Sequence, residues 1–436
     1  MSYPTPDLLL SLAENFIYFY PLFMSFVWMC GGLLFYFRRE FGKNQPPELE
    51  EYPFFSVLVP CHNEEEHIRA TLEQLTRLDY PHFEIIAIDD GSQDETTYQI
   101  HNLCLEHDMI RGIYLTSQQG KATALNTGAL ACKGDLILTV DADAMIAPDA
   151  LRWIAWHFVQ FPKVGAVTGN PRIINRTSLL AKIQIGEFST IIGLIKRSQR
   201  ILGKILTISG VMGAFRRQAL IQTGFWSTDM ATEDIDVTWK LEKQFWDVRY
   251  EPRALCWIYV PESILGLWRQ RCRWARGGLE VLLKHRDIWL EIRQWRLWPI
   301  YTESLLSLVW AYCFWGLALM TLLRLALPFP WAEAFPSLYP PRGAATILAF
   351  TCLLQFTISV CIDSKYDNKL FGYLFWVIWY PVVYWVINSL TMIFTAPRVL
   401  FGKQKEQAVW KSPDRGLKKE EPPERGANRP SSVKKY

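Results

Sequence analysis

Four long stretches without a single charged residue constrain this chain more than any other feature of its sequence. They span residues 16–37, 305–323, 344–362 and 371–396. Each is about as long as the ~20 residues that an α-helix needs to cross a lipid bilayer. The sequence therefore predicts an integral membrane protein with several helical spans.

The composition of the chain agrees with a membrane protein. Half of the 436 residues are hydrophobic, and 19 Trp, 18 Tyr and 25 Phe supply the rings that gather at membrane interfaces. A cleavable signal peptide is the alternative for residues 16–37, but no basic segment precedes them and no small-residue cleavage site follows. The net charge of +3 is too small to indicate nucleic-acid binding, and the nine cysteines lack C-x-x-C spacing, so we expect reduced packing residues.

Basic residues beside the first stretch orient the chain in the membrane. Arg38 and Arg39 follow it directly, while the first 15 residues contain no Lys or Arg. By the positive-inside rule, the N-terminus lies outside and residues from about 38 to 300 are cytoplasmic.

The C-terminal end raises a conflict with this orientation. Three further crossings would put the C-terminus outside, yet the tail after Pro397 is rich in Lys and Arg. Two interpretations stay open: one C-terminal stretch is re-entrant, with a break at Pro381, or the first stretch does not cross.

Between the first and second stretches the pattern changes to short apolar runs separated by helix-like segments. The runs are residues 54–60, 83–92, 111–116 and 135–143, and the helix-like segments are residues 64–78, 94–107 and 120–132. Strands that are apolar on both faces and alternate with helices indicate a mostly parallel sheet in an α/β domain.

Polar residues directly follow three of the predicted strands. They are His62 after the first strand, Asp89 and Asp90 after the second, and Asp141 and Asp143 after the fourth. In open α/β sheets, ligands bind outside the carboxyl ends of the strands. These strand ends therefore predict one binding site at a single edge of the sheet.

Two aspartates one residue apart, Asp141 and Asp143, repel each other unless a positive charge lies between them. A hard divalent ion, Mg²⁺ or Mn²⁺, is usually held by one or two carboxylates together with substrate phosphates, although a loop cap is the alternative. The sequence contains neither a G-x-x-x-x-G-K-[ST] phosphate loop nor a G-x-G-x-x-G segment. Lys121 follows a glycine at a predicted helix start, where it can meet a phosphate or the edge of a base.

Six short motifs occur in the order and approximate spacing of the processive family-2 glycosyltransferases, such as the synthases of cellulose, chitin and hyaluronan. They are VPCHNEE, IDDGSQDET, GKATALN, VDADA, ATEDID and QRCRW, between about residues 53 and 278. Within this family the chain is most similar to bacterial poly-β-1,6-N-acetylglucosamine synthases, which make biofilm exopolysaccharide. The runs that carry this closer similarity are VGAVTGNPRI, GEFSTIIGLIKRSQR, MATEDIDVTWKL and WKSPDRG.

The resemblance implies an α/β glycosyltransferase domain of GT-A type, with a mostly parallel sheet, inserted between transmembrane α-helices. We expect five parts along the chain. They are a transmembrane helix and linker at 1–50, the cytoplasmic GT-A domain at 51–261, interfacial amphipathic helices with the Q-x-x-R-W motif at 262–300, transmembrane helices at 301–400, and a basic, disordered cytoplasmic tail at 401–436.

By this resemblance, Asp90 should pair with the uracil of a UDP-sugar, with Asp89 as the alternative for the same contact. Pro60 and His62 should line the base. The second aspartate of VDADA, Asp143, should bind the divalent metal on the diphosphate, with the first one, Asp141, beside it on the ribose or the metal.

In ATEDID, the resemblance implies that Asp234 is the general base and that Glu233 orients the acceptor or holds the loop. A sugar hydroxyl is a poor nucleophile, and a positioned carboxylate can accept its proton. Thr232 followed by acids also fits a capped helix start, which can itself position the base. One carboxylate base without a second nucleophile implies inversion, so an α-linked UDP donor gives a β-linkage.

QRCRWARGG, residues 270–278, supplies the remaining predicted site residues. Arg271 and Arg273 can hold the diphosphate by paired hydrogen bonds, and Gln270 belongs to the same motif. The indole of Trp274 offers a face on which an acceptor sugar can stack. The segment also fits an amphipathic helix at the membrane surface, and we expect both roles.

The resemblance implies a multi-pass enzyme of the bacterial inner membrane that polymerises N-acetylglucosamine from UDP-N-acetylglucosamine into a β-1,6-linked polysaccharide and couples synthesis to export. It further implies a small membrane accessory subunit and regulation by cyclic di-GMP through that partner. Three alternatives stay open: a synthase of another β-linked polymer (chitin-like, hyaluronan-like or cellulose-like), transfer of one sugar to a lipid carrier, and a non-catalytic membrane subunit with a degenerate glycosyltransferase domain.

Overall fold

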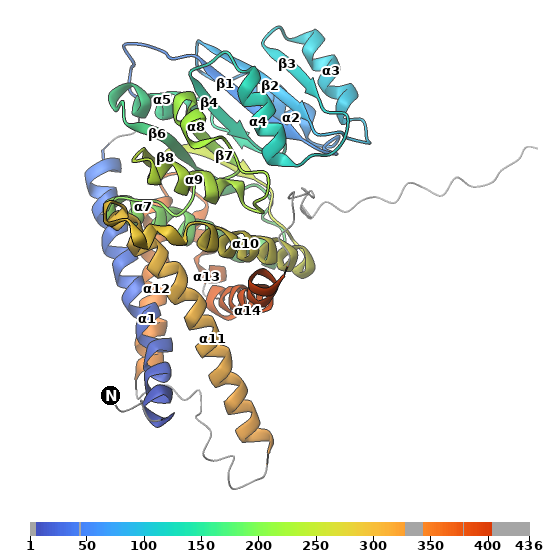
Figure 1. Ribbon diagram of the computed structural model, residues 1–436. Coiled ribbons are helices and arrows are strands. Elements are labelled where there is room, and N and C mark those ends of the chain that lie inside the picture. The colour runs from blue at the N-terminus through green and yellow to red at the C-terminus, as the bar shows by residue number, and fades with distance from the viewer. Residues whose placement is uncertain (1–5, 43–44, 328–342, 378, 403–436) are drawn as a thin grey trace, which may run out of the picture.

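The computed structural model describes residues 6–42, 45–327, 343–377 and 379–402. An α/β domain lies at one end of a group of long helices, and the N-terminal end of the first helix lies at the opposite end of that group (Figure 1). The α/β domain is thus inserted between apolar helices, as predicted. Nearly all of the predicted basic tail lies outside the described residues.

Three long apolar helices account for the first three uncharged stretches. They are α1 at Pro6–Phe35, α11 at Trp298–Ala326 and α12 at Ala344–Asp363. α1 packs against both α11 and α12, and the three run alongside one another (Figure 1). Each is long and apolar enough to cross a membrane, and so is the helical segment Val383–Phe401 of the fourth stretch. The structure therefore agrees with the predicted membrane protein.

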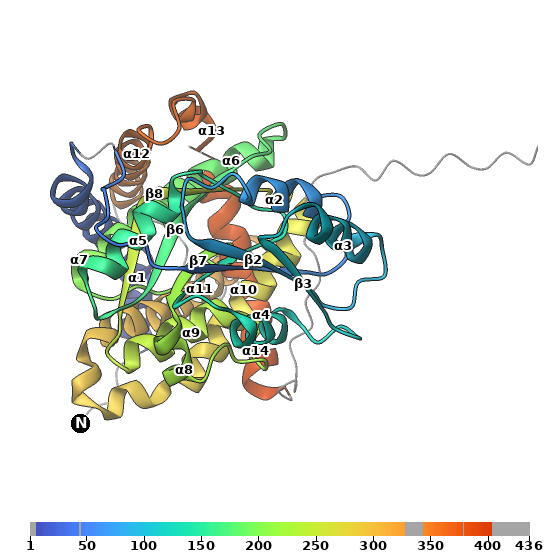
Figure 2. The same ribbon diagram turned by 90° about the horizontal axis from the view of Figure 1, so that it is seen from above.

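The fourth uncharged stretch is not one straight helix. Its pieces are a 3₁₀ turn at Leu370–Tyr373, α13 at Leu374–Val377, a π-helical turn at Pro381–Trp385 and α14 at Val386–Phe401. A proline has no backbone N–H to donate, so the break lies where Pro381 was expected to place it. α14 packs against α10 (Ile264–Lys284) and lies across the direction of the three long helices (Figure 1, Figure 2).

One sheet of eight strands forms the centre of the α/β domain, in the order β3-β2-β1-β4-β7-β6-β8-β5. The four predicted strands, β1 to β4, pair in parallel, whereas β7 is antiparallel to both neighbours and β5 is antiparallel to β8. The bounds are β1 Phe55–Cys61, β2 Phe83–Asp89, β3 Ile110–Tyr114, β4 Leu136–Val140, β5 Met145–Ile146, β6 Val164–Ile173, β7 Met212–Arg216 and β8 Asp247–Ile258.

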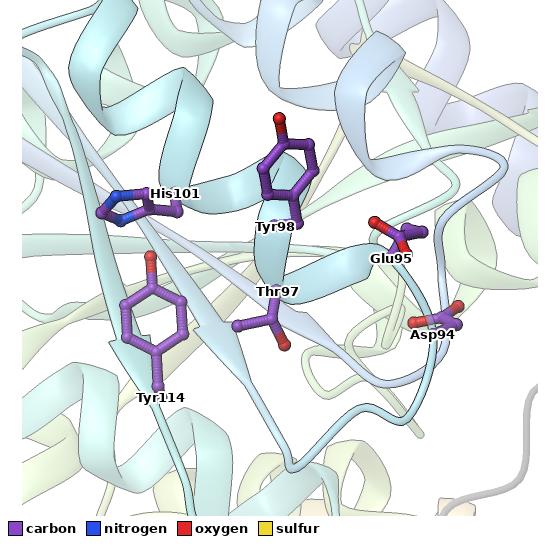
Figure 3. Close-up of a pocket in the computed structure, with 6 residues that line it drawn as sticks. All are labelled: Asp94, Glu95, Thr97, Tyr98, His101 and Tyr114. Atoms are coloured by element: carbon purple, nitrogen blue, oxygen red, sulfur yellow. The ribbon is translucent and has the colours of Figure 1, made fainter.

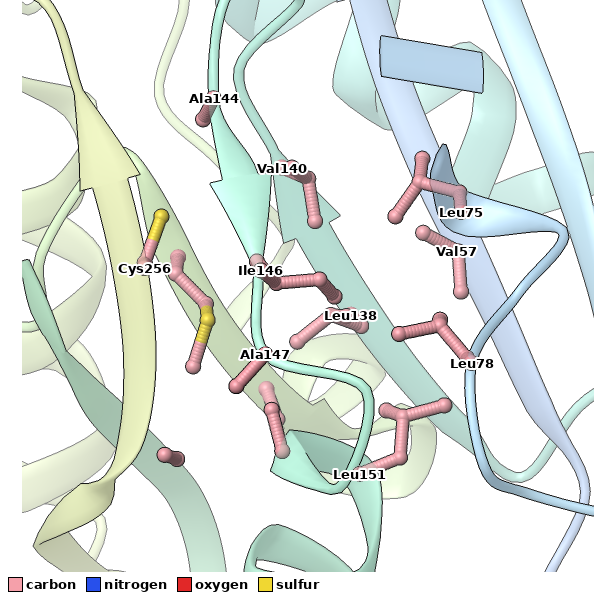
Figure 4. Packing of buried hydrophobic residues seen from close by; sticks show 14 of the residues in the cluster. Val57, Leu75, Leu78, Leu138, Val140, Ala144, Ile146, Ala147, Leu151 and Cys256 are labelled. Atoms are coloured by element: carbon pink, nitrogen blue, oxygen red, sulfur yellow. The ribbon is translucent and has the colours of Figure 1, made fainter. Parts of the chain in front are cut away.

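Helices cover both faces of this sheet. The three segments predicted to be helical form α2, α3 and α4, and further helices follow. Their bounds are α2 Ile68–Leu75, α3 Thr96–Glu106, α4 Lys121–Ala131, α5 Ala150–Gln160 and α8 Arg217–Thr223. Successive residues of a strand point to opposite faces, so Val57 packs in one apolar cluster with Leu75 and Leu138 (Figure 4), while Leu58 packs in a second with Leu125.

A helical segment between β6 and β7 joins the α/β domain to the long helices. It consists of α6 at Leu179–Glu187, a π-helical turn at Phe188–Ile195 and α7 at Lys196–Leu202. α7 packs against α1. Its many buried residues make this segment part of the core.

Two 3₁₀ turns connect α10 to α11, at Arg286–Leu290 and Ile292–Leu297. Leu290, Ile292 and Trp295 are exposed there among basic residues. This distribution fits the predicted amphipathic surface at the membrane interface.

Candidate active site

The parallel register brings the predicted site residues to one edge of the sheet. Cys61 at the end of β1 lies beside Asp89 at the end of β2, and β4 pairs with β1 in the same direction. The carboxyl ends of these strands therefore meet at one edge. Pro60 lies within β1 and His62 directly after it, while Asp141 and Asp143 follow the end of β4.

Asp90 anchors the loop that precedes α4. Its two carboxylate oxygens accept hydrogen bonds from the backbone N–H groups of Gln119, at 2.7 Å, and Gly120, at 2.8 Å. Burial raises the pKa of this carboxyl. Gly120 has a φ of 94°, a conformation that favours glycine, and it is the N-cap of α4. The predicted nucleotide residue thus also fixes the position of Lys121.

Asp89 and His62 are held by the same group of loops. The Asp89 carboxylate accepts hydrogen bonds from the backbone N–H of Ser92, at 3.0 Å, and from the hydroxyl of Thr97. His62 Nδ1 lies 2.9 Å from the backbone oxygen of Asp90. The motif pattern did not single out Ser92 or Thr97, because their role is to position a neighbour rather than to carry chemistry.

Lys121 connects the two acidic motifs of the site. Its Nζ donates to Asp141 Oδ1 at 2.5 Å and to the backbone oxygen of Gly210 at 3.1 Å, and lies 3.6 Å from Glu233 Oε1. These carboxylates raise the pKa of the lysine against the effect of burial. The contact of Lys121 with a phosphate or a base stays a prediction, and the structure adds the ion pair of this lysine with the strand-end carboxylate of Asp141.

Asp234 lies in the first turn of α9 (Glu233–Lys243). Burial and the neighbouring Glu233 raise its pKa to about 6, while Lys121 and Arg273 act in the opposite direction. A Cβ at Gly210 would lie 2.9 Å from Asp234 Oδ2, so the Ser209–Gly210 turn borders this carboxylate closely. A carboxylate with a pKa near neutrality suits a general base.

The helix start at Thr232 is confirmed, but its hydroxyl does not cap the helix. Among the described residues this hydroxyl has no hydrogen-bond partner. The side chain instead packs against Gly277 of α10, where a Cβ would collide with it. α9 is held to the end of α10 a turn further on, where Asp236 lies 3.0 Å from both Lys284 Nζ and His285 Nε2.

The structure separates the two arginines of QRCRW. Arg273 is exposed on α10, near enough to Asp234 to lower the pKa of that carboxyl, and its Nη1 lies 3.5 Å from the backbone oxygen of Ala231. Arg271 is buried, and its two terminal nitrogens each lie 2.5 Å from an oxygen of Glu187. The predicted diphosphate contact of Arg271 is therefore not available in this arrangement, because its hydrogen bonds are committed to Glu187 on α6.

Trp274 lines a cavity of about 270 Å³ between the α/β domain and the long helices. The guanidinium of Arg271 lies over the Trp274 ring, 4.3 Å from its centroid. Polar groups of α7 and α11 face the same cavity from the membrane side; they are Gln199, Glu303, Ser304 and Ser307. Gln270, which we placed in the substrate site, is half-buried on α10.

A second hollow lies on the surface beside α3, about 430 Å³ in volume (Figure 3). Its lining consists of Asp94, Glu95, Thr97, Tyr98, His101 and Tyr114. None of the predicted site residues lines this hollow, but it borders the site, because Thr97 donates to Asp89 and Tyr114 pairs with Asp89 at the ends of β3 and β2.

The strand-end carboxylates fit a hard divalent ion that takes its other ligands from a substrate. No group of three or more His, Cys, Asp or Glu side chains within the described ranges could hold a metal ion by itself. Asp141 and Asp143 offer two carboxylates at the end of β4. Mg²⁺ and Mn²⁺ sites commonly combine one or two carboxylates with phosphate oxygens.

Known proteins resemble this chain over most of its length. Residues 56–224 match the model of the family Glycosyl transferase family 2. A poly-β-1,6-N-acetyl-D-glucosamine synthase of Staphylococcus epidermidis is 41% identical over 411 residues, which cover 92% of this chain and 98% of that protein. The protein of the same name from Staphylococcus aureus (strain COL) is 40% identical over 406 residues, with the same coverage.

A solved structure shows the same fold. It is the mannosyltransferase PcManGT from Pyrobaculum calidifontis in complex with GDP-Man and Mn²⁺, with a TM-score of 0.58 and 22% identity. The match covers 90% of this chain and 99% of that one. The predicted GT-A architecture of the α/β domain is thereby confirmed.

Proposed function

The chain belongs to glycosyl transferase family 2, and from that premise we propose that it polymerises N-acetylglucosamine from UDP-N-acetylglucosamine into a β-1,6-linked polysaccharide. The relatives that carry this activity in their names match the α/β domain and the long helices together. The observation in the structure that most supports transfer chemistry is Asp234, a carboxylate of raised pKa that lies beside Lys121 and Arg273 at the strand-end edge.

In the proposed reaction, Asp234 accepts the proton of the acceptor hydroxyl. The freed oxygen forms a bond to the anomeric carbon of the donor sugar as the bond between that carbon and the diphosphate breaks, and UDP leaves with the bonding electrons. One displacement inverts the configuration, which turns an α-linked donor into a β-linked product. Glu233, held 3.6 Å from Lys121 Nζ, keeps the loop before α9 in place for this step.

The leaving group needs positive charge around the diphosphate. Arg273 is the arginine of the QRCRW motif that remains exposed to meet it. Asp143 and Asp141 would hold a divalent ion, Mg²⁺ or Mn²⁺, which when bound neutralises charge that develops on the departing oxygen. When that ion is not bound, the ion pair with Lys121 keeps Asp141 in its carboxylate form.

The nucleotide and the acceptor occupy opposite sides of this centre in our proposal. Asp90 or Asp89 contacts the uracil, with Pro60 and His62 along the base. The acceptor sugar stacks on Trp274, whose cavity leads toward α11. Gln270 lies on α10 one turn before Trp274 and borders the acceptor.

We place the enzyme in the bacterial inner membrane with its α/β domain in the cytoplasm. α1, α11 and α12 cross the bilayer, whereas α14 lies along the cytoplasmic interface beside α10. Three crossings from an outside N-terminus return the chain to the cytoplasm, where the positive-inside rule places a basic tail. Coupled export, a small membrane subunit and control by cyclic di-GMP stay predictions of the family resemblance.

Product analysis tests the proposed function. The full chain, purified in detergent or nanodiscs, is incubated with radiolabelled UDP-N-acetylglucosamine and Mg²⁺ or Mn²⁺, with and without a membrane extract. We expect UDP release and a polymer whose linkage analysis shows β-1,6 bonds. A different β-linkage would contradict the product assignment, a short lipid-linked product would contradict polymerisation, and failure of the folded protein to bind UDP would favour a non-catalytic subunit.

A further inference from the structure

Lys196, the first residue of α7, is a buried lysine that the proposed reaction leaves without a role. Only 5% of the residue is exposed. Its Nζ donates one hydrogen bond, to Thr168 Oγ1 at 3.3 Å, and lies 6.0 Å from the centre of the Tyr250 ring. A buried ammonium group is costly unless opposite charge or several hydrogen bonds compensate it. We therefore looked for the groups that stabilise the Lys196 ammonium in this buried position.

The hydrogen bond of Lys196 leads directly to the active-site turn. Thr168 Oγ1, on β6, also accepts the backbone N–H of Ser209 at 2.8 Å. The next residue, Gly210, accepts from Lys121 through its backbone oxygen and lies against Asp234 Oδ2. One hydroxyl thus joins Lys196 to the turn that borders the proposed base.

The charges around Asp234 come from four elements. Glu233 lies on α9, Lys121 on α4 and Arg273 on α10, and these three act on the pKa of Asp234. Lys196 lies on α7, and its link to Asp234 runs through Thr168 and the Ser209–Gly210 turn. Lys121 is shared with Asp141 and Glu233, and Arg273 is exposed to solvent. Lys196 differs from both: burial lowers its pKa to about 7, and the group that opposes this shift is Asp234.

The next residue in the chain fixes the position of α7. The buried guanidinium of Arg197 pairs with Glu40 at 2.6 Å and with Asp363, at the end of α12, at 2.9 Å. Glu40 ends the π-helical turn Tyr36–Glu40 that continues α1. Lys196 is thus attached to a point that two of the long helices hold. The ion pairs of Arg197 therefore oppose small displacements of the Lys196 ammonium group relative to the Ser209–Gly210 turn.

We propose that Lys196 is a positioning residue for the transfer reaction, which supports the ionised form of Asp234 and fixes the Ser209–Gly210 turn through Thr168. This inference rests on the proposed function. When Asp234 is ionised, the Lys196 ammonium stabilises the negative charge; without that charge nearby, Asp234 binds a proton more readily. Loss of Lys196 therefore affects the reaction most at low pH.

The test compares polymerisation rates of purified full-chain variants from about pH 5.5 to about pH 9. Lys196→Met removes the charge and Lys196→Arg keeps it. Thr168→Val removes the hydroxyl that joins Lys196 to the turn. Lys204→Met is the matched control, because Lys204 follows α7 in the same segment and donates to the backbone oxygen of Glu242, away from Asp234. UDP binding shows that each variant is folded.

We expect Lys196→Met to lose about tenfold more activity at about pH 6 than at about pH 8.5. The acidic side of its pH–rate profile should shift to higher pH. Lys196→Arg should keep the wild-type ratio of these rates, and Lys204→Met the wild-type rate. Thr168→Val should lower kcat with little change in the KM for UDP-N-acetylglucosamine. An equal loss at every pH in Lys196→Met would overturn the electrostatic role.

Two further outcomes separate this inference from the proposed function. If Lys196→Met does not bind UDP, Thr168→Val decides, and an unchanged kcat in that variant overturns the positioning role. If the wild-type protein makes no polymer from UDP-N-acetylglucosamine, the proposed function itself fails. A wild-type enzyme that is active alongside a Lys196→Met variant with an unchanged pH profile refutes the inference about Lys196 alone.

Discussion

At the residue scale, Asp234 carries the strongest prediction. Asp234→Asn keeps the shape of the side chain but cannot accept a proton, so we expect kcat to fall by about 100-fold or more. UDP binding should be almost unchanged, because the proposed nucleotide contacts lie on β1 and β2. Steady-state UDP release and UDP titration measure the two quantities. Full activity in Asp234→Asn would show that the base has been misassigned.

Glu242 provides a matched control on the same helix. It is buried, and burial raises its pKa to about 7, but its Oε1 accepts a hydrogen bond from the backbone N–H of Ile205 rather than facing the strand ends. Glu242→Gln retains an acceptor oxygen for that bond and should keep most of the activity.

The wild-type rate should fall as pH drops through about 6, the pKa of Asp234, because a protonated carboxyl cannot accept a proton.

The two arginines of QRCRW should respond differently to substitution. Arg273→Met removes an exposed cation near Asp234, and we expect a higher KM for UDP-N-acetylglucosamine and a lower kcat with little change in stability. Arg271→Met leaves Glu187 buried without its partner, which typically costs about 3–5 kcal/mol of stability. Thermal unfolding and steady-state kinetics separate these two effects. A stable Arg271→Met variant with a raised KM would instead show that Arg271 binds the diphosphate.

At the element scale, the contact between α9 and α10 depends on one glycine. Gly277 lies against the side chain of Thr232, so Gly277→Ala should push α10 away from the start of α9 and lower both activity and stability. Gly278→Ala is the control, because nothing lies within 4 Å of a Cβ at that position. Alanine stabilises a helix interior by roughly 0.5–1 kcal/mol relative to glycine, so this variant should be neutral or slightly more stable.

Activity and melting temperature measured on both glycine variants test this contact. Equal behaviour of the two would mean that α10 can shift without disturbing α9. The comparison is informative because both substitutions add one methyl group to the same helix, and only their surroundings differ.

At the scale of the whole molecule, a buried network of charges ties the long helices to the catalytic domain. Arg197 lies between Glu40 and Asp363, and the Tyr366 hydroxyl donates to Glu40 at 2.6 Å. Arg172 of β6 lies 3.2 Å from Asp363. These contacts join the π-helical turn after α1, α7, α12 and the sheet, so buried, directional interactions set the orientation of the α/β domain relative to the long helices.

Membrane topology is a second question at this scale. With α1, α11 and α12 crossing and α14 at the interface, we expect an epitope tag at the N-terminus to be cleaved by protease added to intact spheroplasts. A tag at the C-terminus should be protected until the membrane is opened. A C-terminal tag that is cleaved from outside would mean that α14 also crosses.

The sequence alone determined the parts of this protein that depend on local pattern. Uncharged stretches predict α1, α11 and α12 because the bilayer demands about 20 apolar residues for each crossing. Apolar runs between helical segments predict the parallel strands β1 to β4, and parallel strands necessarily bring Asp89, Asp90, Asp141 and Asp143 to one edge. The resemblance added Asp234, which lies in the first turn of α9.

The tertiary structure decided which charges meet, because those contacts join residues far apart in the chain. Arg271 looks available for substrate in the sequence, but Glu187 holds it, and Asp141, the proposed metal ligand, pairs with Lys121. The antiparallel direction of strand β7 was likewise not predictable, since it does not follow from periodicity within one segment. The local sequence pattern determines on which face of a helix or strand a side chain lies. Its contact partner depends on how elements that are distant in the chain pack together.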